Sequence, residues 1–102
     1  MKEHRWPSWK VIEITTTHPE QIQGLMDEWV AKTEGRRKTH RTGSGRDRPD
    51  TYGQIVEFPS YEEAMDNSRL SETSEFAGKL GKRCDPPPTF RNLDLHRVDD
   101  LT

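Results

Sequence analysis

The sequence predicts an α+β domain in which helices cover one face of a four-stranded antiparallel sheet. Two observations support this fold class. Strand-like and helix-like apolar patterns follow one another in the order strand, helix, strand, strand, paired helix, strand, and turn-rich segments separate them. Two strand–helix units joined through a hairpin match the split β-α-β plan. The chain has 102 residues, so we expect one domain over residues 1–102, with residues 1–7 as an N-terminal tail.

The first strand and helix are expected within residues 9–35. The segment WKVIEITT, residues 9–16, is rich in β-branched and aromatic residues, and its alternation places Ile12 and Ile14 on one face. Thr17 stands three residues before Glu20, with a proline between them, which predicts a capped helix start. Gly35 is expected to end this helix. Its apolar residues recur at the helical spacing of three and four, namely Ile22, Leu25, Met26, Trp29 and Val30.

The middle of the chain is expected to form a hairpin. Residues 36–42, RRKTHRT, alternate charged residues with threonine and predict an exposed edge strand, and residues 43–50 predict a flexible loop. The segment DTYGQIVEF then returns to apolar strand character, and Pro59 ends that strand. Ser60, followed three residues later by Glu63, predicts a capped helix start.

The last third of the chain predicts a broken helix and a final strand. We expect one helix over residues 61–68 that buries Ala64 and Met65, a break near Leu70, and a second helix over residues 71–83. The DPPP segment then prevents the helix from continuing. The segment TFRNLDLHRV, residues 89–98, alternates as a strand, and one of its faces carries Phe90, Asn92, Asp94, His96 and Val98.

Composition indicates a sparse hydrophobic core. Leu, Ile, Val and Phe number 17 in total, and a share of these residues below about 20% raises the suspicion of disorder. The net charge is only -2, which argues against disorder. Burial of further apolar surface against a partner would stabilise such a domain, so we expect a homodimer formed through the open face of the sheet.

Cysteine content and hydropathy indicate a cytoplasmic, soluble protein. Cys84 is the only cysteine, so an intrachain disulfide or a multi-cysteine metal site is excluded, and a buried thiol is expected. The first ten residues carry charges and a proline, unlike a signal peptide. No apolar run approaches the roughly 20 residues needed to cross a membrane.

The segment IVEFPSYEEA, with Ser-Glu-Phe further on, resembles the dimeric α/β-barrel superfamily of ferredoxin-like proteins, which includes antibiotic-biosynthesis-type monooxygenases. This resemblance implies a sheet-to-sheet homodimer and a pocket between sheet and helices in each subunit. It also implies an alternative function, cofactor-independent oxidation of small aromatic compounds. It identifies no catalytic residue. The residues that carry it are Glu57, Phe58, Pro59, Ser60, Ala64, Ser74, Glu75 and Phe76.

The basic segment 36–48 has a local charge of +5 and is compatible with an anion or nucleic-acid site. It contains no stacking aromatic residue, and the whole chain is slightly acidic. Charges on an edge strand also discourage aggregation between sheets. We therefore favour a solvated edge strand, and nucleic-acid binding is not expected.

The histidines support neither a metal nor a haem. His40 and His96 fall on predicted strands and could meet across the sheet as a proton-transfer or metal pair, but their spacing matches no metal motif. The haem-degrading branch of the superfamily relies on a helical histidine. Here His4 and His18 lie in a tail and at a helix entrance. We expect no metal and no cofactor.

We expect the protein to bind a small ligand between sheet and helices, although no set of catalytic residues converges in the sequence. Trp29 is either a core residue of its helix or the wall of a pocket that stacks on a flat ligand. The other candidates are polar groups near predicted apolar surfaces. The candidate ligand-binding residues are Trp29, His40, Tyr52, Tyr61 and Asn67.

Overall fold

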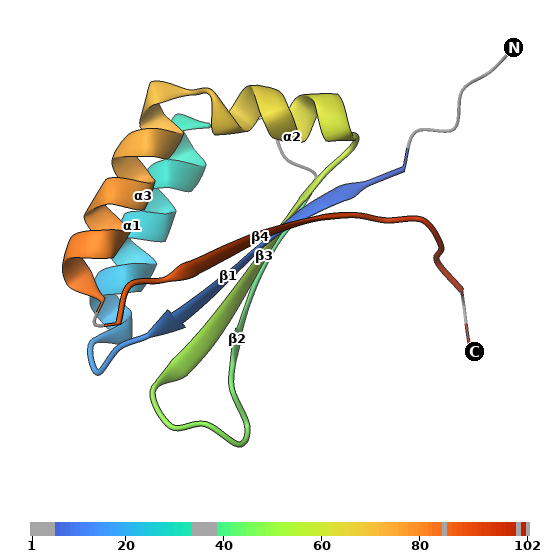
Figure 1. The fold of residues 1–102 in the computed structure, drawn as a ribbon. Coiled ribbons are helices and arrows are strands. Elements are labelled where there is room, and N and C mark those ends of the chain that lie inside the picture. Colours follow the sequence, from blue (N-terminus) through green and yellow to red (C-terminus); the bar gives the residue numbers. More distant parts are fainter. Residues whose placement is uncertain (1–5, 34–38, 85, 100, 102) are drawn as a thin grey trace, which may run out of the picture.

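A computed structural model describes residues 6–33, 39–84, 86–99 and 101. Helices lie on one side of a single twisted sheet, as Figure 1 shows. The predicted fold class and element order are confirmed. The elements are β1 (Ser8–Thr15), α1 (Pro19–Lys32), β2 (Thr39–Ser44), β3 (Thr51–Phe58), α2 (Tyr61–Ser68), α3 (Ser71–Arg83) and β4 (Thr89–Asp94).

The sheet has the order β2-β3-β1-β4, and all its neighbouring strands are antiparallel. β1 is therefore central, and β2 lies at an edge as predicted. Along β1, Ile12 pairs with Gln54 of β3 and with Phe90 of β4, which brings residues far apart in sequence onto one row. Because side chains alternate between faces, this register determines which residues of all four strands face the helices.

The core lies between the sheet and the helices α1 and α3. The inward face of β1 carries Ile12 and Ile14, and the inward face of β3 carries Val56 and Phe58, all fully buried. The predicted apolar stripe of α1 meets them, with Val30 and Ala64 partly buried against the cluster. The buried apolar residues are Ile12, Ile14, Ile22, Leu25, Met26, Trp29, Val56, Phe58, Phe76, Leu80 and Cys84.

The helix ends agree with the sequence in part. Ser60 caps α2 as predicted, since its hydroxyl accepts a hydrogen bond from the backbone N–H of Glu63 at 3.3 Å. The start of α1 differs: His18 is the capping residue and makes no side-chain cap bond, while the hydroxyl of Thr16 accepts from the N–H of His18 at 3.0 Å. The Thr17–Glu20 cap is therefore wrong. The helix ends at Lys32, and Gly35 lies outside the described residues.

Two strand boundaries also differ from the prediction. β2 continues to Ser44, two residues into the predicted loop, because Gly43 and Ser44 pair with Gly53 and Tyr52. β4 stops at Asp94, which pairs with Ser8, the first residue of β1. One backbone bond follows, from the N–H of Leu95 to the carbonyl of Pro7 at 3.0 Å, and residues 96–98 pair with no strand in the described part of the chain. The prediction that His96 lies on a strand is therefore wrong.

No helix in the described part of the chain is both long enough and apolar enough to cross a membrane.

Candidate functional site

Two grooves open between the helices and the sheet in the described part of the chain, one on the β4 side and one on the β2 side. The groove on the β4 side, called the Lys10 groove below, has a volume of about 210 Å³. An apolar cavity of about 150 Å³ is enough to hold benzene, so a single aromatic ring with a substituent fits this space. Its lining residues are Lys10, Trp29, Ser68, Thr73, Ser74, Phe76, Ala77, Phe90 and Asn92.

Lys10 lies on the sheet side of this groove. It faces inward because it alternates in phase with Ser8 and Ile12, and its cross-strand neighbour on β4 is Asn92. Its Nζ donates a hydrogen bond to the hydroxyl of Ser68 at 3.3 Å. The Ser68 hydroxyl in turn donates to the carbonyl of Ala64 at 3.1 Å, so its own proton is already used.

The ammonium of Lys10 has no carboxylate partner among the described residues, and it is the only ionisable group that lines the groove. Asp94, on the same face of β4, accepts a hydrogen bond from Ser8 at 2.9 Å. Glu57 faces the opposite side of the sheet, where it accepts from the indole of Trp9 at 2.8 Å. Burial without a counter-charge lowers the pKa of Lys10 below its ordinary value.

An aromatic pair forms the helix side of the Lys10 groove. Trp29 of α1 stacks on Phe76 of α3, with ring centroids 4.9 Å apart and planes inclined by 12°. The indole N–H donates to the hydroxyl of Thr73 at 3.0 Å, so Trp29 is buried with its polar atom satisfied. Phe90, 41% exposed, adds a third aromatic ring from β4.

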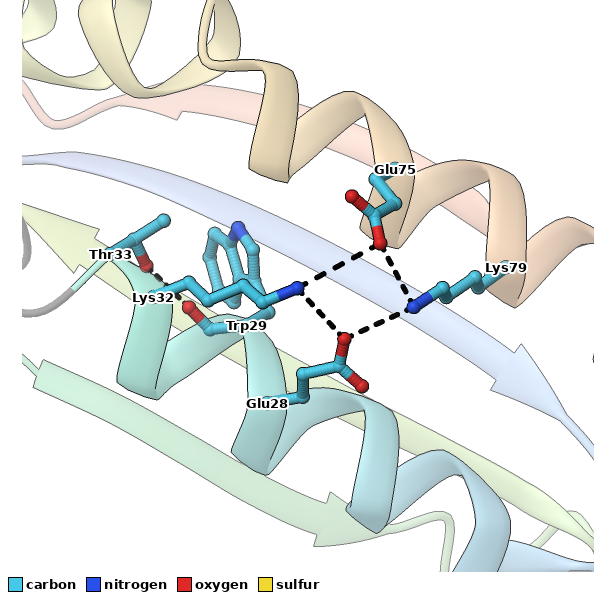
Figure 2. Close-up of polar contacts among 6 residues, drawn as sticks. All are labelled: Glu28, Trp29, Lys32, Thr33, Glu75 and Lys79. Carbon is cyan, nitrogen blue, oxygen red and sulfur yellow. Dashed lines mark hydrogen bonds and ion pairs between the residues drawn. The ribbon is translucent and has the colours of Figure 1, made fainter.

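Four charged residues on the outer surface join the same two helices, as Figure 2 shows. One oxygen of Glu28 accepts from both Lys32 and Lys79 at 3.0 Å. Glu75 pairs with Lys79 at 3.0 Å and with Lys32 at 3.8 Å. Hydrogen bonds from the two lysines hold the pKa of Glu28 below its ordinary value. We call these four residues the α1–α3 ion-pair cluster, which joins the two helices on their solvent-exposed side.

The second groove, called the β2 groove, has a volume of about 340 Å³. Tyr52 and the buried Gln54 of β3 line it, together with Thr42 of β2. His40 is not a lining residue, but its Nε2 lies 3.2 Å from Oε1 of Gln54 and 3.5 Å from the hydroxyl of Thr42. The lining residues are Pro19, Glu20, Ile22, Gln23, Thr42, Gly43, Ser44, Tyr52 and Gln54.

The structure therefore separates the five candidate ligand-binding residues. Trp29 lines the Lys10 groove and is also a core residue, whereas Tyr52 lines the β2 groove. His40 does not line the β2 groove but contacts Gln54, which does. Tyr61 is 54% exposed at the first position of α2 and lines neither groove.

Asn67 is the fully buried residue of α2. The sequence predicted that this helix buries Ala64 and Met65, but both are only partly buried. Neither the amide nitrogen nor the oxygen of Asn67 has a hydrogen-bond partner in the part of the chain that the structure describes. Asn67 does not line the Lys10 groove, although the next residue, Ser68, does. A buried amide with both polar atoms unsatisfied is costly to the folded state.

Sequence reasoning missed Lys10, Phe90 and Asn92 as groove residues. The alternation of β1 placed Lys10 on the face of Ile12 and Ile14, so a lysine pointing into the core was a readable signal. Its proximity to Ser68 and Asn92 was not readable, because those contacts depend on strand order.

His40 and His96 do not meet across the sheet, which the sequence had left open as a possibility. His40 lies on β2 and His96 follows β4, and β2 and β4 are the opposite edges of the sheet, with two strands between them. Three strand spacings of about 4.8 Å separate such edges. Among the described residues, no three His, Cys, Asp or Glu side chains gather as a metal site.

Cys84 is a buried free thiol as predicted, and burial raises its pKa.

The opposite face of the sheet is not covered by helices. By register, its central row carries Ile55 of β3 beside Val11 of β1, with Arg41 and Arg91 at the two ends of the row. The next row carries Glu57, Trp9 and Leu93. Leu93 is 47% exposed. Of the basic segment 36–48, residues 36–38 lie outside the described residues.

The fold is shared with several solved structures, although no family model and no curated protein matches the sequence. A conserved protein from Methanosarcina mazei superposes with a TM-score of 0.73 at 10% identity, over 87% of this chain and 92% of that one. A candidate antibiotic biosynthesis monooxygenase from Caulobacter crescentus gives 0.73 at 9% identity, over 91% and 92%. A dimeric ferredoxin-like protein of unknown function from Jannaschia sp. gives 0.69 at 14% identity, over 87% and 99%.

These likenesses confirm the predicted ferredoxin-like fold. At such low identity, they carry no activity over to this chain.

Proposed function

We propose that the protein is a small-ligand-binding domain whose ligand lies in the Lys10 groove. The observation that carries this proposal is a groove of about 210 Å³ with aromatic walls, a few polar side chains and one charged group, a lysine on its sheet side that has no carboxylate partner among the described residues. Ligand sites typically combine an apolar lining with a few placed polar groups. The β2 groove is larger, but it has neither an unpaired charge nor a stacked aromatic wall among its described lining residues.

The proposal does not extend to the monooxygenase alternative. Lys10 is the only ionisable side chain among the described residues that line the groove, so these residues offer no acid and base pair for substrate oxidation. Members of the same fold that carry a monooxygenase name support the fold and not this chemistry.

The test uses a neutral aromatic fragment and a variant that fills the groove. Benzamide is titrated into ¹⁵N-labelled protein, and we expect shifts of the backbone amide signals of Phe76, Ala77 and Phe90. Ala77→Phe places a ring in the groove and should abolish these shifts. Gly78→Phe is the matched control, because an added Cβ at Gly78 meets nothing within 4 Å and the position is exposed.

Thermal unfolding of both variants checks that they fold, and Ala77→Leu is a smaller substitution to use if Ala77→Phe does not. Absence of benzamide binding to the native protein, or binding that Ala77→Phe and Ala77→Leu leave unchanged, would show that this groove is not the ligand site.

We further propose that the open sheet face joins two copies of the chain. The apolar side chains of Trp9, Val11, Ile55 and Leu93 gather on it, with arginines and glutamates around them. In a two-fold interface both subunits use the same patch. A face that carries positive and negative side chains can therefore pair with the same face of a second copy. The dimeric Jannaschia protein of the same fold is compatible with this assembly.

Ile55→Glu tests this interface, because it places a carboxylate in the centre of the apolar row. Sedimentation at micromolar concentration should report a dimer for the native chain and a monomer for Ile55→Glu. Glu62→Gln, on the exposed first turn of α2, is the control and should stay dimeric. A native chain that sediments as a monomer would refute the interface.

We also place the protein in the cytoplasm, because its cysteine is a buried, free thiol.

A further inference from the structure

Among the described residues, the ammonium of Lys10 has no counter-charge, and no other charged side chain lines its groove. A lysine carries three N–H donors, and one of them is used by Ser68. The facing carboxylate of β4, Asp94, is engaged by Ser8 instead. A partly buried charge without a partner is stabilised when a partner of opposite charge is added. No described residue supplies this partner, and an anion bound from solution would provide it.

The surroundings of the ammonium limit which anions fit. Phe76 and Phe90 lie on the helix and strand sides of the groove, and Trp29 stacks behind Phe76. A flat ring between these side chains would bury apolar surface and gain ring contacts. One unpaired positive charge matches one negative charge, and the second charge of a dianion would lie beside aromatic rings without a partner.

We propose that the ligand is a planar aromatic monocarboxylate, with its carboxylate on Nζ of Lys10 and its ring between Phe76 and Phe90. This assignment rests on the proposed function, because it names the ligand class of the same groove. Asn92 is the cross-strand neighbour of Lys10, and its amide can donate to the second carboxylate oxygen. The groove volume of about 210 Å³ limits the ligand to one ring with small substituents.

The test compares benzoate with benzamide, which have nearly the same shape and differ in charge. In the native protein, benzoate should bind roughly 10- to 100-fold more tightly, the range expected for a hydrogen bond to a charged group. Lys10→Met keeps the length of the side chain and removes its charge. In this variant the affinity for benzoate should fall to that for benzamide, while benzamide binding should persist.

Three controls separate the possible causes. Lys10→Arg keeps the cation and should retain the preference for benzoate. Lys82→Met removes an exposed lysine from the last turn of α3 and should change nothing. Inorganic phosphate, which has charge but no ring, should not shift the amide signals of Phe76 and Phe90.

The outcomes also separate this inference from the proposed function. If benzamide and benzoate bind equally well and Ala77→Phe abolishes both, the groove is a ligand site but the carboxylate assignment is refuted. Preference for benzoate that survives Lys10→Met refutes it too. If neither compound binds, both the groove and the assignment fail.

Discussion

The α1–α3 pair and strand β4 border the same groove but are held in opposite ways. The helices enclose a stacked Trp29 and Phe76, and the α1–α3 ion-pair cluster joins them on the outside. β4 pairs with β1 alone, and all six of its residues are exposed. The two regions therefore have different roles: the helix pair stabilises the fold, whereas β4 presents Phe90 and Asn92 to the groove and Leu93 to the open face.

Truncating one aromatic residue from each region is the strongest test of this contrast. Trp29→Ala should lower the free energy of unfolding by about 3–5 kcal/mol, because it removes a fully packed ring and leaves a cavity. Phe90→Ala should lower it by about 1 kcal/mol or less, because its ring is 41% exposed, yet it should weaken benzoate binding. Urea denaturation measures both values. Equal losses would show that β4 belongs to the core.

A second test of the contrast between the buried helix layer and the exposed β4 uses Asn67, a buried residue of the helix layer that we expect to be destabilising. Asn67→Leu has similar volume and removes two unsatisfied polar atoms, so it should raise the free energy of unfolding by about 1–3 kcal/mol. Asn67→Asp is the opposite control and should destabilise the fold, since it buries a charge. A destabilised Asn67→Leu would mean that the amide has a partner, such as bound water, in solution.

Lys10 links stability to pH on the groove side. Its pKa is lowered in the folded protein. At a pH between the folded pKa and the ordinary value of 10.5, the unfolded chain therefore binds more protons at Lys10 than the folded protein does. The contribution of Lys10 to stability therefore increases through that window, because its desolvation cost disappears when it loses its proton. The difference in unfolding free energy between native protein and Lys10→Met isolates this effect from the other lysines. A difference that is flat through alkaline pH would contradict the burial of Lys10.

The smallest effect is expected at the α1–α3 ion-pair cluster. Its side chains are about half exposed, and exposed ion pairs contribute little to stability. Glu28→Gln should cause a small loss of thermal stability that disappears in 1 M salt, where charges are screened beyond about 3 Å. Glu20→Gln, on the same helix but outside the cluster, is the control. A large, salt-independent loss would show that the cluster, and not the aromatic pair, holds the helices together.

Local patterns predicted most of the fold but little of the site. The helical spacing of α1 identified its buried stripe, and the Ser60 hydroxyl caps α2 as its position before Glu63 indicated. Those features depend on neighbours within one or two turns. The end of β4 at Asp94 did not follow from its alternation, because a strand needs a paired neighbour and β1 offers none beyond Ser8. The prediction of the site residues from the sequence failed for the same reason, because the residues that line the groove come from separate helices and strands.

By itself, the sequence determined which side chains share a face of each element, because helix and strand periods are local properties of the chain. It placed Lys10 in phase with Ile12 and Ile14, and therefore toward the core. Only the tertiary structure decided what Lys10 meets there. Strand order and helix packing arise from contacts between distant residues, so they alone brought the hydroxyl of Ser68 to the ammonium and left it without a carboxylate partner among the described residues.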